Sequence, residues 1–124
     1  MTKLNISNSE LEIMKALWRQ QPLTVGQVIE RVKMSNDWHD NTIKTLLNRL
    51  LKKELAARFR EGGRFFYQPL VTEEDYLTQE SEGLLTKFFE GKMAPLVAHF
   101  ANHKKLTAKD VAEIQAILEQ MKHD

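Results

Sequence analysis

Seven polar side chains recur on one side of a predicted helix in the middle of the chain, and their types suit nucleic-acid binding. Arginine can pair with guanine through two hydrogen bonds, asparagine can pair likewise with adenine, and threonine can bond to a base or a phosphate. Lysine suits phosphate oxygens. An ordinary solvated charged face would have the same composition, so the surrounding elements must decide. The set is Thr42, Lys44, Thr45, Asn48, Arg49, Lys52 and Lys53.

Apolar and polar residues alternate on both sides of Gly62 and Gly63, which predicts a β-hairpin with a tight turn. Arg58, Arg60 and Arg64 lie on or near this hairpin. Arginines beside a glycine turn can approach a phosphate backbone closely, and we expect Arg60 and Arg64 to do so. The alternative is that they are edge charges that prevent aggregation.

Three helices are predicted before the hairpin. The first starts after Ser7 and stops before Pro22, and the second starts at Thr24 with a capping box. Asp40 or Asn41 is the expected N-cap of the third, whose apolar stripe is Ile43, Leu46, Leu47, Leu50 and Leu51. Three short helices followed by a basic hairpin predict a winged helix-turn-helix over residues 1–72, with the third helix in the major groove. The predicted fold class is mainly α with a small β-hairpin wing.

Residues 73–124 are predicted to be a helical dimerisation region. Helices are expected over about 73–90, 93–102 and from Thr107 to about Lys122. Residues 44–64 carry seven basic and two acidic groups, whereas residues 73–124 carry six basic and ten acidic ones. The apolar residues could close a monomeric core, but a segment this short rarely buries enough area alone. The expected homodimer contacts are Leu84, Phe88, Leu96, Val97, Phe100, Ile114, Leu118 and Met121.

The composition excludes several other classes of protein. No cysteine is present, so disulfides and thiolate metal sites are excluded, and a cytoplasmic location is expected. We expect no signal peptide and no membrane helix. His99 and His103 are four residues apart, which is metal-ligand spacing, but no third ligand of a known motif accompanies them. We therefore predict no metal, no cofactor and no enzyme activity.

The chain resembles the penicillinase and methicillin-resistance repressors over nearly its whole length. The matching stretches are residues 9–14, 17–18, 42–53, 63–69 and 96–100. The most specific of them are the Thr-x-x-Thr-x-x-x-Arg-Leu run that begins at Thr42 and the aromatic wing after Gly63. The resemblance implies a homodimeric repressor of dyad operators, often built on TACA and TGTA half-sites. It also implies release when a membrane sensor-protease pathway cleaves the tail.

Two departures from that family pattern matter. His99-Phe100 stands where penicillinase-type members have the cleaved asparagine–phenylalanine pair, which leaves the position of any cut open. A sister branch senses copper through cysteine pairs, and this chain has none. Two further readings remain: a winged helix that binds protein instead of DNA, and a DNA-binding regulator controlled by a ligand or metal.

Overall fold

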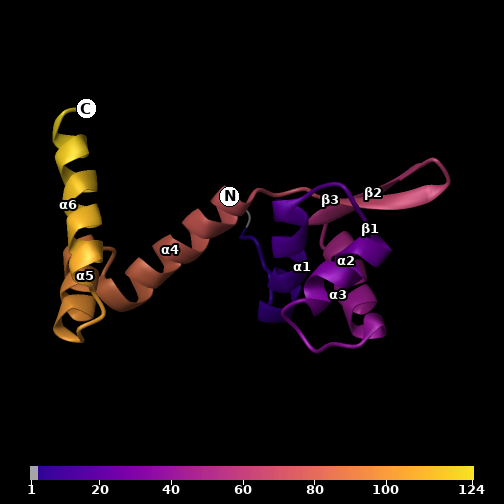
Figure 1. Ribbon diagram of the computed structural model, residues 1–124, viewed down its shortest axis with the longest axis horizontal. Helices are drawn as coiled ribbons and strands as arrows, with labels where there is room; N and C mark the ends of the chain where they lie inside the picture. Colours follow the sequence, from indigo (N-terminus) through magenta and orange to yellow (C-terminus); the bar gives the residue numbers. More distant parts are fainter. Residues whose placement is uncertain (1–2) are drawn as a thin grey trace. The chain divides into compact units, whose positions relative to one another are not determined.

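The computed structural model describes residues 3–124 (Figure 1). The chain divides into two compact units, one that runs to Gln79 and one from Glu80 to Asp124. No helix of the described residues is long and apolar enough to cross a membrane. The helices of the first unit are α1 (Asn8–Arg19), α2 (Val25–Lys33) and α3 (Asp40–Lys52), and its strands are β1 (Leu23–Thr24), β2 (Ala56–Glu61) and β3 (Arg64–Pro69).

Side-chain caps fix where the first helices begin. The Ser7 hydroxyl accepts from the Glu10 N–H at 3.1 Å, and the Glu10 carboxylate accepts from the Ser7 N–H at 2.9 Å. Thr24 and Gln27 form the same reciprocal box at α2, which confirms the predicted starts.

The predicted cap of α3 was wrong. Neither Asp40 nor Asn41 is the N-cap; it is His39, whose Nδ1 accepts from the Asn41 N–H at 3.4 Å. The Asp40 carboxylate instead pairs with Lys33. An imidazole nitrogen can therefore take the place of the expected carboxylate or amide oxygen.

The three helices bury one apolar stripe each in a shared core. On α3 the buried residues are those expected, Ile43, Leu46, Leu47 and Leu50, while Leu51 is half-buried. Ile13, Met14 and Leu17 of α1 and Val28 and Val32 of α2 complete the centre of the core. The remaining face of α3 is thereby left to solvent.

The sheet is antiparallel, with strand order β1-β3-β2. Glu61 faces Arg64 across a two-residue turn, in which Gly62 and Gly63 have φ of 58° and 79°. Positive φ at both positions is what a type I′ hairpin turn requires. The β2–β3 hairpin extends past the three helices, and the predicted fold class is confirmed (Figure 1). The two-residue β1 was not predicted, because two residues show no alternation.

The first turns of α4 (Glu73–Phe89) belong to the first unit. Tyr76 is buried, and its ring centre lies 5.9 Å from that of Trp18. The Trp18 indole also donates to the Val71 carbonyl at 2.9 Å. The first compact unit thus extends to Gln79. The predicted functional division between residues 72 and 73 stays a prediction.

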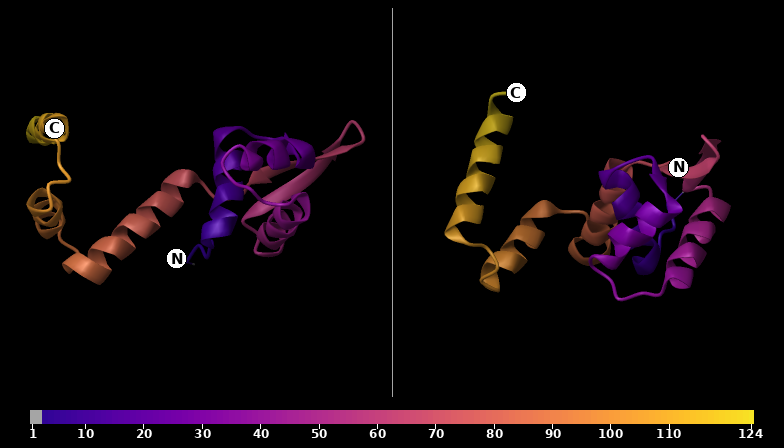
Figure 2. Two further views of the ribbon diagram at one scale, coloured as in Figure 1. Left: turned by 60° about the horizontal axis from the view of Figure 1, so that its bottom comes forward. Right: turned by 45° about the vertical axis from the view of Figure 1, so that its right-hand side comes forward.

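The second unit contains the rest of α4, α5 (Met93–Asn102) and α6 (Ala108–Lys122), joined by short connections (Figure 2). The expected helix ends are confirmed: Gly91 has φ of 76° after α4, and Thr107 forms a capping box with Asp110 at α6. No residue of the described stretch 80–124 is buried within this chain.

Candidate nucleic-acid interface

The outer face of α3 holds the polar residues together. Thr42, Lys44, Thr45, Asn48, Arg49, Lys52 and Lys53 are all exposed, opposite the buried leucines. A helix turns about 100° per residue, so positions 41, 45, 48 and 52 form a single line along its centre. Asn41 was not among the predicted contacts, although its place seven residues before Asn48 would have revealed it. The face therefore presents two amides, a hydroxyl and an ammonium in one row.

Arg49 and Lys44 flank that row on opposite sides. Arg49 stands seven residues after Thr42 and shares its side of the helix, while Lys44 lies on the side of Leu51. The Thr45 hydroxyl donates to the Asn41 carbonyl at 2.9 Å, which leaves the hydroxyl oxygen available as an acceptor. Hydrogen-bonding amides and hydroxyls and cationic side chains are thus arranged across the exposed half of α3.

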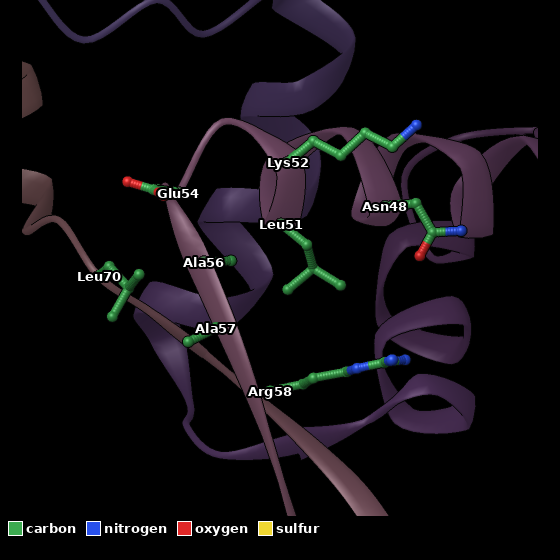
Figure 3. A pocket seen from close by; sticks show the side chains of 8 residues that line it. All are labelled: Asn48, Leu51, Lys52, Glu54, Ala56, Ala57, Arg58 and Leu70. Atoms are coloured by element: carbon green, nitrogen blue, oxygen red, sulfur yellow. The ribbon is translucent and has the colours of Figure 1, made fainter.

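A groove of about 780 Å³ separates the end of α3 from β2 (Figure 3). Asn48 and Lys52 line one wall, and Arg58 extends from the other wall toward the same side. Arg58 lay on the predicted hairpin but was not among the predicted DNA contacts. The packing of β2 against α3 places it there. The groove joins the polar face of the helix to the wing.

The wing carries an aromatic side chain between two arginines. The Phe65 ring centre lies 4.5 Å from the Arg58 guanidinium carbon and 5.6 Å from that of Arg60. Arg60 faces Phe65 directly across the ladder, and Phe65 itself is 43% exposed. Guanidinium groups held over a ring are attracted by its negative face. Phe65 therefore limits where the two arginines point.

Arg64 has a different setting at the tip of the hairpin. It is exposed, directly follows Gly63 and faces Glu61 across the turn. Glycine at positions 62 and 63 leaves open space around the backbone there. The tip can therefore come close to a surface without a side chain in the way.

Lys53 differs from the other lysines of α3. Its ammonium lies 2.7 Å from the Glu10 carboxylate and donates to the Asn5 carbonyl at 3.0 Å. Burial raises the pKa of Glu10, but hydrogen bonds from Lys53 and Ser7 and the charge of Lys53 outweigh it and hold that pKa below its ordinary value. The ammonium of Lys53 is thus paired with a buried carboxylate, although the lysine itself is partly exposed, and its predicted contact with phosphate stays a prediction.

The two histidines singled out by spacing lie together in the second unit. The His99 and His103 ring centres are 4.4 Å apart, and His103 Nδ1 lies 2.8 Å from the His99 carbonyl oxygen. Among residues 3–124, no three His, Cys, Asp or Glu side chains are grouped as a metal site would need. The His99–Phe100 bond lies within α5.

The predicted dimer contacts are mostly exposed apolar side chains. Leu84, Phe88, Val97, Phe100, Leu118 and Met121 are exposed, and Leu96 and Ile114 are half-buried. Further exposed apolar residues lie on the same helices at Met93, Val111 and Ile117. So many exposed large apolar side chains on three short helices are typical of an interaction site.

Comparison with known proteins identifies a family and several relatives. The sequence profile of the penicillinase repressor family matches residues 6–120. The penicillinase repressor of Bacillus licheniformis is 33% identical over 118 residues, which cover 95% of this chain and 92% of that protein. The methicillin resistance regulatory protein MecI of Staphylococcus aureus is 32% identical, over 91% of this chain and 92% of its own.

A solved structure matches the first unit. It is the solution structure of the monomeric form of Bacillus licheniformis BlaI in complex with the blaP half-operator. The two share 37% sequence identity with a TM-score of 0.54, over 59% of this chain and 89% of that one. The matched fold is the winged helix described above.

Proposed function

The chain belongs to the penicillinase repressor family, and from that premise we propose that it is a homodimeric transcriptional repressor of a palindromic DNA operator. The family consists of DNA-binding transcriptional repressors, which confirms that the chain is not an enzyme. In the relative of known structure, the DNA partner is a half-operator. A cytoplasmic location remains a prediction from sequence.

The observation that carries the proposal is the exposed polar row of α3 beside the groove that holds Arg58. A major groove admits one helix and displays a different donor and acceptor pattern for each base pair. We propose that Thr42, Thr45, Asn48 and Arg49 face base edges, while Lys44 and Lys52 contact phosphates. Arg60 and Arg64 of the wing follow the backbone alongside, and the arrangement adds Arg58 to this group.

Selection from random duplexes, followed by binding titrations between about 50 and 200 mM salt, tests this reading. We expect one enriched sequence with dyad symmetry and a steep fall of affinity with salt. Arg49→Ala should cost about 1–3 kcal/mol on that sequence and relax the preference at one position. Unchanged affinity of Arg49→Ala would contradict the placement of α3. Failure to enrich any duplex would favour a winged helix that binds protein.

We propose that the second unit joins two copies through the exposed apolar side chains of α4, α5 and α6. A two-fold axis makes one patch self-complementary, so a single apolar surface is sufficient. Such a dimer presents two winged-helix units, here called readers, to one face of the DNA. The half-sites then lie a whole number of turns apart, each turn about 34 Å. Tethering raises the effective concentration of the second reader, so each reader alone binds weakly.

Loss of the tail would then release the operator. A cut within residues 92–105, through a sensor-protease pathway, would separate the readers from α6. The His99–Phe100 bond lies within helix α5, whereas the connection from His103 to Leu106 lies outside any helix. Proteolytic nicking prefers exposed loops to regular elements, which supports the connection as the weaker point.

A chain that ends at Gln79 tests the role of the tail. It keeps Tyr76 and Gln79, which pack with the first unit. We expect it to be a folded monomer that binds a half-site and loses most of its affinity for the full operator. A shortened chain that binds the full operator as tightly as the intact one would refute the role of the tail.

A further inference from the structure

Glu10 is a charged residue in an otherwise apolar interior. Its side chain is only 2% exposed, and it is the one charged residue among the buried residues of the described chain. Removal of one partner of a buried ion pair leaves an unpaired charge, which is strongly unfavourable. The carboxylate therefore depends on the groups around it.

Those groups come from two separate segments. The Ser7 N–H donates to Glu10 Oε1 at 2.9 Å from the start of α1, and the Lys53 ammonium donates to the same oxygen at 2.7 Å from the end of α3. Lys53 also donates to the Asn5 carbonyl at 3.0 Å. The Glu10–Lys53 ion pair and the Asn5 contact therefore connect the end of α3 to the first turn of α1 and to the residues before it.

The segment before α1 is itself held. Leu4 exchanges two hydrogen bonds with the Gln79 amide, one of 2.7 Å from the Leu4 N–H and one of 2.8 Å to its carbonyl. Asn5, which accepts the hydrogen bond from Lys53, directly follows Leu4 and is therefore held in place by Gln79. Because this segment is fixed, it cannot move with α3 if the helix tilts. The contact therefore restrains the end of α3.

Lys52 provides the contrast within the same turn. It is exposed, lines the groove beside Arg58 and forms no ion pair within the described residues. Two adjacent lysines thus have opposite surroundings. One is free to reach phosphate, and the other is committed to a buried carboxylate.

We propose that Glu10 and Lys53 are positioning residues, whose ion pair fixes the angle at which α3 enters the major groove, and that Lys53 does not contact phosphate. This inference rests on the proposed function, since it assumes that α3 reads DNA. The lowered pKa of Glu10 supports it, because the carboxylate stays charged at neutral pH. The pair then acts on the operator only through the orientation of the helix.

Glu10→Gln separates the two roles of Lys53. The amide keeps the size of the side chain and an oxygen that can accept from the Ser7 N–H, but it removes the negative charge that holds the lysine. A lysine that binds phosphate would then bind it as well as before or better. A lysine that positions α3 would lose its hold, and operator affinity would fall.

The experiment uses four variants of the full chain: Glu10→Gln, Lys53→Met, the two together, and Lys52→Met as the matched control. Affinity is measured for the selected operator and for an unrelated duplex across a salt range. We expect Glu10→Gln and Lys53→Met each to lower operator affinity about tenfold, the size of one lost base contact, with little change on the unrelated duplex. The double variant should match either single one, because both remove the same interaction.

The salt slope decides the remaining question. One phosphate contact contributes about 0.9 to the slope. We expect Lys53→Met to leave the slope unchanged, while Lys52→Met flattens it by about one and weakens both duplexes alike. If Lys53→Met flattens the slope and Glu10→Gln leaves operator affinity unchanged, the positioning role is overturned.

Two controls keep the outcomes distinct. Circular dichroism and titration to saturation give the folded, active fraction of each variant; if Lys53→Met does not fold, Glu10→Gln alone decides. If the wild type shows neither a preferred duplex nor a salt slope, the proposed function itself fails. If the Lys52→Met effect appears but that of Glu10→Gln does not, the function stands and only the positioning role is wrong.

Discussion

The first and second units of this chain treat apolar side chains in opposite ways. In the first unit, Ile13, Leu23 and Leu50 are 0% exposed. In the second, Phe88 is 62% exposed and Met121 is 64% exposed. Both units contain several helices, so the presence of helices alone does not explain the difference. What differs is whether the helices cover one another.

This difference indicates a division of labour. Burial of apolar area is the dominant favourable contribution to folding, so the first unit contains the means of its own stability. The second unit forms helices but leaves much of their apolar surface in water. Such a surface is expected to gain its stability from a second copy, and its folding then depends on protein concentration.

The largest expected effect is from a cavity in the first unit. Leu50→Ala should lower the free energy of unfolding by about 2–5 kcal/mol, because the leucine is fully buried. Leu118→Ala is the matched substitution in the second unit, where the side chain is exposed. We expect it to leave the unfolding of the first unit unchanged and to weaken self-association. Urea denaturation measures the free energy of unfolding of each variant, and sedimentation measures its self-association. Equal losses of unfolding free energy in the first unit for the two variants would contradict the contrast between the units.

A smaller effect is expected at the wing. Phe65→Leu keeps apolar bulk but removes the ring that faces Arg58 and Arg60. The two arginines lose a preferred direction, and each such contact contributes about 0.5–1 kcal/mol at an exposed site. Operator affinity should fall by a few-fold with no change in melting temperature. Phe59→Leu is the control, since Phe59 stacks on Phe66 and has no arginine partner among the described contacts. Equal losses of operator affinity for the two variants would contradict the role of the Phe65 ring in orienting the arginines.

The smallest effect concerns acid. Because the pKa of Glu10 is lowered in the folded chain, its ion pair stabilises the first unit at pH values above 4.5, the ordinary pKa of this carboxyl. This stabilisation is lost as the pH falls below 4.5 and through the lowered pKa. Wild type should therefore lose more melting temperature between neutral pH and about pH 4 than Glu10→Gln does. Thermal scans of the first unit across that range measure the difference. Parallel curves for the two chains would show that Glu10 does not contribute.

The local features of this fold were predictable from sequence, and the long-range ones were not. Ser7, Thr24 and Thr107 carry their caps within three residues, so the helix starts could be predicted from short patterns. His39 was missed because histidine is not among the usual capping residues.

The site divides in the same way. The exposed face of α3 follows from a single helix period, and every predicted residue on it is exposed. The Glu10–Lys53 pair joins residues 43 positions apart, and Arg58 reaches the groove through the packing of β2 against α3. Neither could be inferred without the packing of α1 on α3 and the register of β2.

The contrast between the units is tested most directly by sedimentation of the intact chain and of the chain that ends at Gln79, over a wide range of concentrations. We predict that the intact chain sediments at twice its mass of 14.4 kDa and dissociates only on dilution. The shortened chain should remain a folded monomer at every concentration. An intact chain that stays monomeric at high concentration, or a shortened chain that dimerises, would contradict the account.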